Sequence, residues 1–194
     1  MAEQGDRDGQ DERRRRKRAE LTAQSLEELA LSYVARFSTT AKKLEMYCHR
    51  KLRERGWSAD ERGGPPVDAI VARLVEKGYV DDAAYARMRS EGLLRRGYGE
   101  RRVEQALFAV GVAETDRIDI GVAQARHAAL HMAKKRHFGP FGRDGRPEDR
   151  AVREKQVAAM LRAGHSLDSA RQLTDARTIE AATSWAHEYD EDEQ

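Results

Sequence analysis

Apolar residues recur at helical spacing along most of the chain, from about residue 25 to residue 173. Positions three and four apart carry leucine, valine, isoleucine, tyrosine or methionine, while charged residues fill the positions between them. This period places the apolar side chains on one face of an α-helix. The only alternating stretch, residues 118–122 (Ile-Asp-Ile-Gly-Val), is short and lies inside a helical stripe. The pattern therefore predicts an all-α protein.

Capping residues and glycines divide this pattern into short helices. The predicted helix starts are residues that cap a helix well or precede one: Ser25 in a capping box with Glu28, Pro65-Pro66, Asp81 or Asp82, Asp149 and Ser166. Between them, one long helix is predicted to carry an apolar stripe from Ile118 to Met132.

Three similar segments suggest an internal repeat. A leucine or methionine stands four residues before a glycine in Leu52–Gly56, Leu107–Gly111 and Met160–Gly164, and the glycines are 55 and 53 residues apart. A unit of three such helices is too small to bury its own apolar face well, whereas stacked units make a continuous core. We therefore predict an elongated, curved array of three tandem three-helix repeats.

The same signals predict the boundaries of the parts. The charged head has few apolar residues, which favours disorder. The predicted parts are a disordered head at 1–24, repeat 1 at 25–80, repeat 2 at 81–120 with its third helix merging into the long helix to about residue 137, repeat 3 at 121–175 with a Gly/Pro-rich loop at 137–147, and a C-terminal helix or acidic tail at 176–194.

Charge is distributed unevenly, although the net charge is only +2. Between Arg36 and Arg153 there are 25 Lys and Arg against 17 Asp and Glu, whereas Glu188 to Glu193 contains five acidic residues and no base. A basic middle region favours a polyanion or an acidic protein surface as partner. Because the chain has one cysteine and neither a secretory signal nor a membrane-spanning stretch, we expect a cytoplasmic protein.

The residue pairs that could carry catalysis or hold a metal give only weak evidence for such a site. Cys48 precedes His49, but neighbouring residues on a helix point in different directions and no orienting acid is evident. His127 and His131 are one helical turn apart, but no third ligand follows at a convincing spacing. No Ser/His/Asp or paired-carboxylate pattern stands out. We therefore predict no enzymatic activity, no cofactor and no metal.

The turn Gly97-Tyr98-Gly99 resembles a phosphate loop, but Arg102 takes the place of the third glycine and no strand precedes it. What remains is a turn before a helix N-terminus. The free N–H groups there, together with the flanking arginines, would form an edge that attracts anions. An ordinary solvated corner fits equally well. Tyr98 could stack on a base or a partner side chain, or pack on its own helix.

Three motifs of the middle region occur in a characteristic order. Residues 74–87 (LVEKGYVDDAAYAR) precede residues 95–99 (RRGYG), and the following helix ends in residues 107–112 (LFAVGV). In order and spacing the chain resembles the RecX regulatory protein family, strongly from about Tyr33 to Val112 and more weakly to Leu173.

The resemblance implies a cytoplasmic bacterial modulator of the RecA recombinase, monomeric and without catalytic activity. Such proteins bind the RecA filament on single-stranded DNA and inhibit its ATPase, its extension and strand exchange. The charge pattern alone also allows a stand-alone nucleic-acid-binding helical module. The candidate contacts to RecA or DNA are Lys42, Lys43, Arg50, Lys51, Arg95, Arg96, Tyr98, Arg101 and Arg102.

Overall fold

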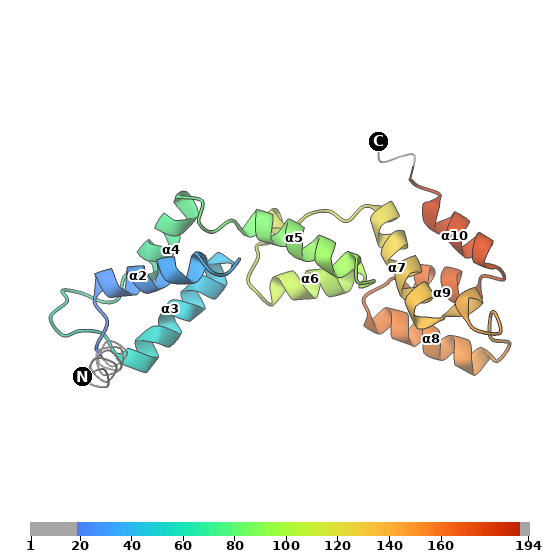
Figure 1. Ribbon diagram of the computed structural model, residues 1–194, viewed down its shortest axis with the longest axis horizontal. Helices are drawn as coiled ribbons and strands as arrows, with labels where there is room; N and C mark the ends of the chain where they lie inside the picture. The colour runs from blue at the N-terminus through green and yellow to red at the C-terminus, as the bar shows by residue number, and fades with distance from the viewer. Residues whose placement is uncertain (1–18, 191–194) are drawn as a thin grey trace, which may run out of the picture. The chain divides into compact units, whose positions relative to one another are not determined.

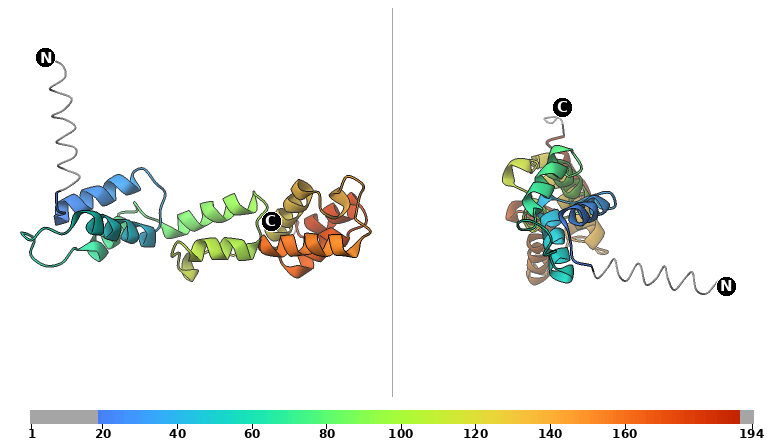
Figure 2. Two further views of the ribbon diagram at one scale, coloured as in Figure 1. Left: turned by 90° about the horizontal axis from the view of Figure 1, so that it is seen from below. Right: turned by 90° about the vertical axis from the view of Figure 1, so that its left-hand side faces the viewer.

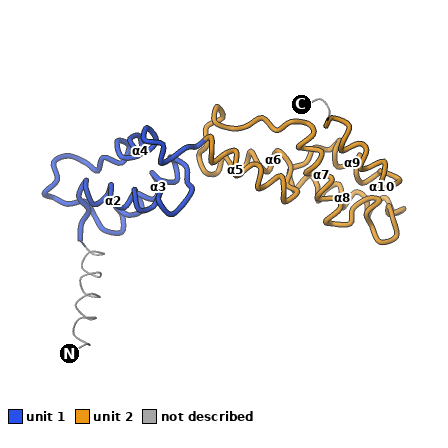
Figure 3. Tube along the Cα trace, turned by 45° about the horizontal axis from the view of Figure 1, so that its top comes forward, with its two compact units in different colours: residues 1–82 blue, residues 83–194 orange. Residues whose placement is uncertain are grey.

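The computed structural model describes residues 19–190 of the chain. The regular elements in these residues are helices, apart from a single bridge between Leu21 and Trp57. The predicted all-α class is therefore confirmed. Two compact units follow one another, the first ending at Asp82 and the second beginning at Ala83 (Figure 3). Most of the predicted disordered head and the last four residues of the acidic tail lie outside the described residues.

The helices are labelled as in Figure 1. They are α2 (Ala23–Val34), α3 (Ala41–Arg55), α4 (Val67–Glu76), α5 (Asp82–Leu94), α6 (Glu100–Phe108), α7 (Val122–Arg136), α8 (Arg150–Arg162), α9 (Leu167–Asp175) and α10 (Ile179–His187), with short 3-10 helices at Glu114–Asp116 and Gly139–Phe141. No helix within residues 19–190 combines the length and the apolar character needed to cross a bilayer.

In unit 1, α2, α3 and α4 pack around one apolar core (Figure 1). Its most deeply buried side chains come from the apolar positions at helical spacing and are at most 1% exposed: Leu26, Leu44, Ile70 and Leu74. Cys48 lies in the same core, and burial raises the pKa of its thiol to about 11. The thiol therefore stays protonated at neutral pH, which suits a packing role rather than a nucleophile.

Helix α2 begins earlier than predicted. Thr22, not Ser25, is the N-cap: its hydroxyl accepts the N–H of Ser25, and the hydroxyl of Ser25 accepts the N–H of Thr22 at 2.9 Å. Ser25 thus fills the position that Glu or Gln usually holds in a capping box. Glu61 also accepts the N–H of Ala23 at 3.0 Å. The predicted start is wrong because Leu21, fully buried, already anchors the chain four residues earlier.

In unit 2, α5 and α6 lie side by side and share a small core (Figures 1 and 2). Tyr85, Leu93, Val103 and Leu107 are its main buried side chains. The core is thin because the helices are short. A unit of this size is expected to pack on neighbouring helices, because it cannot bury its own apolar face well.

Helix α7 starts at Val122, not at Ile118 as predicted, and Gly121 is its N-cap. Ile118 has the spacing of the predicted α7 stripe but precedes the helix, as does Ile120. Ile120 packs against the core of α5 and α6. The predicted stripe therefore ran past the start of the helix.

The last helices of unit 2 form a third core, in which α7 packs on α9 and α10 and α8 packs on α9. Ala129, Met160 and Leu173 are fully buried there. The predicted cap of α9 is confirmed, since the hydroxyl of Ser166 accepts the N–H of Ser169. Asp149, where the preceding helix was predicted to begin, is the N-cap of α8 and accepts the N–H of Ala151 at 2.7 Å.

Candidate interaction site

The turn between α5 and α6 ends one helix and begins the next. The N–H of Gly97 donates to the carbonyl of Leu94, and the N–H of Tyr98 donates to that of Leu93. These bonds use carbonyls that the end of α5 would otherwise leave unpaired. Gly97 has a φ of 83°, a conformation that favours glycine. A Cβ there would also lie 3.1 Å from the backbone nitrogen of Met132 on α7.

Gly99 joins α6 to the end of α8. Its N–H donates to the carbonyl of Ala163 at 2.9 Å, and the N–H of Arg101 donates to the carbonyl of Gly164 at 3.2 Å. The N-terminus of α6 therefore meets the C-terminus of α8, and the two helices lie end to end (Figures 1 and 2). This arrangement aligns the helix dipoles favourably.

This joint bears on one of the two interpretations of the turn. The anion-receptive interpretation relied on free N–H groups at the start of α6, but the carbonyls of Ala163 and Gly164 at the end of α8 accept those of Gly99 and Arg101. The local sequence does not indicate this contact, because its partners are more than sixty residues apart in the chain. Any anion bound at this corner must therefore be held mainly by side chains.

His165, which sequence reasoning missed, locks the same joint. The side chain is 3% exposed, and its Nε2 lies 3.0 Å from the carbonyl oxygen of Gly97. A carbonyl can only accept, so Nε2 carries the proton and donates. Burial lowers the pKa of His165, and the bond to Gly97 only partly opposes that effect. The sequence feature that could have pointed to His165 is its position directly after Gly164, the third of the repeating glycines.

The buried, neutral state of His165 predicts a pH-dependent stability. Above its ordinary pKa of 6.5 the ring is neutral in both folded and unfolded chains, so its contribution is fully present. As pH falls below 6.5, the unfolded chain takes up the proton more readily and the stability falls, by at most about 1.4 kcal/mol per pH unit.

The variant His165→Gln keeps a donor near Nε2 but does not titrate in this range. Urea unfolding at pH 7.5, 6.5 and 5.5 measures both proteins. We expect the stability of the unaltered protein to fall more steeply than that of the variant. Parallel curves over the three pH values would show that His165 does not carry the effect.

The four arginines around the turn lie at the surface of this joint. Arg95 lies 3.8 Å from Glu91, and Arg96 donates to the carbonyl of Gly92. Arg101 and Arg102 are exposed, and neither guanidinium has an ion-pair partner among residues 19–190. The structure thus brings the predicted cations to one corner and leaves two of them available to a partner.

Tyr98 is 37% exposed, and the guanidinium of Arg96 lies 5.7 Å from the centre of its ring. Both interpretations made from the sequence are compatible with this position, since the ring has one partner of its own and an open part. A stacked cation and ring form a flat surface that can accept a base or another side chain.

The second predicted cluster lies on α3 in unit 1. Lys42 pairs with Glu45 at 3.0 Å, and Lys51 pairs with Glu54. Arg50 and Lys51 also lie 5.4 and 5.7 Å from the centre of the Tyr47 ring. Lys43 is half-buried. These cations are therefore partly neutralised by acids on the same helix, which distinguishes them from Arg101 and Arg102.

An open cleft of about 520 Å³ lies beside the joint within unit 2. Arg95 lines it from α5, and His127 and His131 line it from α7. The two histidines do not act as a pair, because the ring of His127 turns to His187 on α10 instead. His187 was not considered in the sequence, since its contact with His127 spans 60 residues.

Comparison with known proteins identifies the family. A model of the second three-helix domain of RecX matches residues 81–117. The regulatory protein RecX of Myxococcus xanthus is 34% identical over 161 residues, which is 78% of this chain and 84% of that protein. This chain belongs to the RecX family. RecX proteins of Agrobacterium fabrum and Pseudomonas fluorescens are 31% and 26% identical, over 73% and 68% of this chain and 77% and 80% of theirs.

The RecX domain match coincides with the candidate site. Residues 81–117 include α5, the glycine turn and α6, together with all four arginines and Tyr98. The match to RecX relatives extends over more than two thirds of the chain, beyond that domain. The protein is therefore a member of a family of regulatory proteins. The segment that matches the RecX domain includes the exposed arginine corner, formed by Arg95, Arg96, Arg101 and Arg102.

Proposed function

We propose that this protein is a cytoplasmic, monomeric, non-catalytic regulator that binds the RecA filament on single-stranded DNA. By binding, it inhibits the ATPase of the filament, its extension and strand exchange. Membership of the RecX family of regulatory proteins is the observation that carries the proposal. The buried thiol of Cys48, with a pKa of about 11, supports the non-catalytic part, because it removes the one candidate nucleophile.

The arginine corner of unit 2 supplies a contact for such a partner. Arg101 and Arg102 extend from the first turn of α6 without an ion-pair partner in the described residues. Guanidinium groups bind phosphates and carboxylates through paired N–H groups. A filament of protein on DNA offers both kinds of anion, so we propose that Arg95, Arg96, Tyr98, Arg101 and Arg102 face it.

A stand-alone nucleic-acid-binding module is the second candidate, favoured by α3. Tyr33 stacks on Tyr47 with ring centres 4.2 Å apart, and Phe37 beside them is 56% exposed. With Arg50 and Lys51 close to Tyr47, this group combines aromatic faces and cations as single-strand-binding surfaces do. In this alternative Lys42, Lys43, Arg50 and Lys51 would contact the DNA directly.

Binding measurements separate the two functions. The labelled protein is titrated with a bare oligonucleotide and with RecA filaments assembled on the same oligonucleotide, and fluorescence anisotropy reports binding. We expect the filament to bind at least about tenfold more tightly, a difference of about 1.4 kcal/mol. Equal or tighter binding to bare DNA, with affinity falling by about 0.7 per neutralised phosphate on a log-log salt plot, would favour the nucleic-acid module instead.

A further inference from the structure

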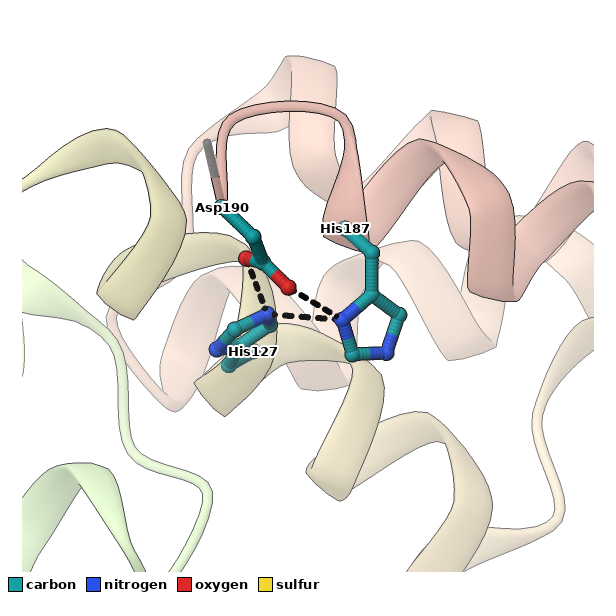
Figure 4. Close-up of side chains that lie close together, drawn as sticks. All are labelled: His127, His187 and Asp190. Carbon is teal, nitrogen blue, oxygen red and sulfur yellow. Dashed lines mark hydrogen bonds and ion pairs between the residues drawn. The ribbon is translucent and has the colours of Figure 1, made fainter. Parts of the chain in front are cut away.

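Two histidines and an aspartate meet where α10 ends against α7 (Figure 4). Nε2 of His127 lies 3.2 Å from Nδ1 of His187 and 2.9 Å from Oδ1 of Asp190. Nδ1 of His187 lies 2.7 Å from Oδ2 of Asp190. Three potential metal ligands therefore converge at one point, although they come from segments about sixty residues apart.

Surrounding contacts hold these side chains in place. Ala182 and Ala186 bury the inner face of α10 against α7. Arg126, next to His127, donates to the carbonyl of Trp185 at 2.8 Å and pairs with Glu188 at 2.6 Å. Its guanidinium also lies between the rings of Trp185 and Tyr189, at 4.5 and 4.4 Å from their centres. The positive charge of Arg126 is thus already paired with Glu188.

Without a metal, the carboxylate of Asp190 connects the two rings. A hydrogen bond from His187 lowers the pKa of Asp190, so its carboxylate is ionised and only accepts. When both facing ring nitrogens carry protons, Nε2 of His127 faces Oδ1 of Asp190 and Nδ1 of His187 faces Oδ2, so one carboxylate bridges the two rings. Oδ1 of Asp190 is also shielded from solvent.

A cation between the three groups can take the place of the ring protons that face Asp190, because each group would then direct a lone pair at it. Zinc binds imidazole nitrogen and carboxylate oxygen at about 2.0–2.2 Å, so two tetrahedral ligands lie about 3.3 Å apart. The observed separations of 3.2, 2.9 and 2.7 Å, the last two to different oxygens of Asp190, need to open by about 0.1–0.6 Å to reach that value. His187 is exposed, which leaves room for water as the fourth ligand.

We propose that His127, His187 and Asp190 bind a divalent transition-metal ion, with Zn²⁺ as the best match. Magnesium and calcium prefer oxygen ligands and do not suit two imidazoles. The bound ion would fasten the end of α10 and the start of the acidic tail to α7. This site departs from the sequence-based expectation of no metal, which considered His127 with His131 and His137 but not His187 or Asp190.

Equilibrium dialysis of tag-free, chelator-treated protein against Zn²⁺ tests the site. We expect one zinc per chain, and less than a tenth of that occupancy at the same free zinc concentration in His127→Ala, His187→Ala and Asp190→Asn. His131→Ala is the matched control, since that exposed histidine lies one turn along α7 outside the cluster, and it should bind as the unaltered protein does.

Thermal unfolding gives an independent readout. At a zinc concentration about one hundred times the dissociation constant, the melting temperature of the unaltered protein should rise by about 5–10 °C, whereas millimolar Mg²⁺ should not change it. Because His187 is the last residue of α10 and Asp190 lies in the turn that follows, their variants should melt normally without zinc. Unchanged binding in the cluster variants, loss of binding in His131→Ala, or no zinc binding at 100-fold molar excess would each overturn the proposal.

Discussion

Replacing Gly99 with alanine is expected to destabilise the protein by about 3 kcal/mol or more. A Cβ at this position would lie 2.4 Å from the carbonyl carbon and oxygen of Gly164 and from the nitrogen of His165. All three are backbone atoms, so α6 and α8 would have to separate. That movement would break the bonds from Gly99 to Ala163 and from Arg101 to Gly164, which cost about 1 kcal/mol each. Gly99 itself has an ordinary φ of −85°, so the requirement is one of space.

The same substitution at Gly92 is a matched control. Gly92 lies inside α5, and a Cβ there would meet no atom within 4 Å. Alanine should therefore stabilise the protein by about 0.5–1 kcal/mol, because it reduces the entropy lost on forming the helix. Urea unfolding of the two variants measures the contrast. Two changes of the same sign and similar size would refute the close contact between α6 and α8.

Removing the four arginines of the turn should weaken inhibition of RecA at least about tenfold. The variant changes Arg95, Arg96, Arg101 and Arg102 to alanine, which takes charge from the proposed contact surface while its exposed positions leave the fold intact. The weaker inhibition corresponds to about 1.4 kcal/mol of binding free energy. It should come with a weaker salt dependence, by about one unit of log-log slope for each phosphate that an arginine no longer neutralises.

A control variant removes four positive charges elsewhere in unit 2. Lys134, Lys135, Arg136 and Arg143 are exposed, and the first three end α7, where the helix dipole accounts for them. Titrations of RecA ATPase activity with both variants and circular dichroism of each give the comparison. If inhibition weakens equally in the two variants, net charge rather than the arginine corner is responsible.

Local patterns predicted much of the fold. The approximate starts of α4, α8 and α9 and the cap of α9 were predicted from spacing and local residue types, because these signals lie within a few residues of each other. The start of α7 was missed because Ile118 keeps the helical spacing although the helix begins only at Val122. The start of α2 was missed because Ser25 can act as a cap and also as the partner of a cap at Thr22.

The joint and the histidine cluster could not be predicted in the same way. The contact of Gly99 with Gly164 and that of His127 with His187 depend on the packing of helices far apart in sequence. Spacing along one helix suggested His131 as the partner of His127, but α10 supplies the nearer ring. The arginines of the turn were identified as exposed candidates, yet only the fold shows that the N–H groups of Gly99 and Arg101 beside them are already bonded.

The most direct test of the proposed function is the ATPase activity of RecA on single-stranded DNA as this protein is added. A regulator that binds the filament should slow ATP hydrolysis at amounts well below one molecule per RecA monomer. The variant without the four arginines of the turn should require at least about ten times more protein for the same effect. Unchanged ATP hydrolysis at a saturating concentration of the unaltered protein would contradict the account.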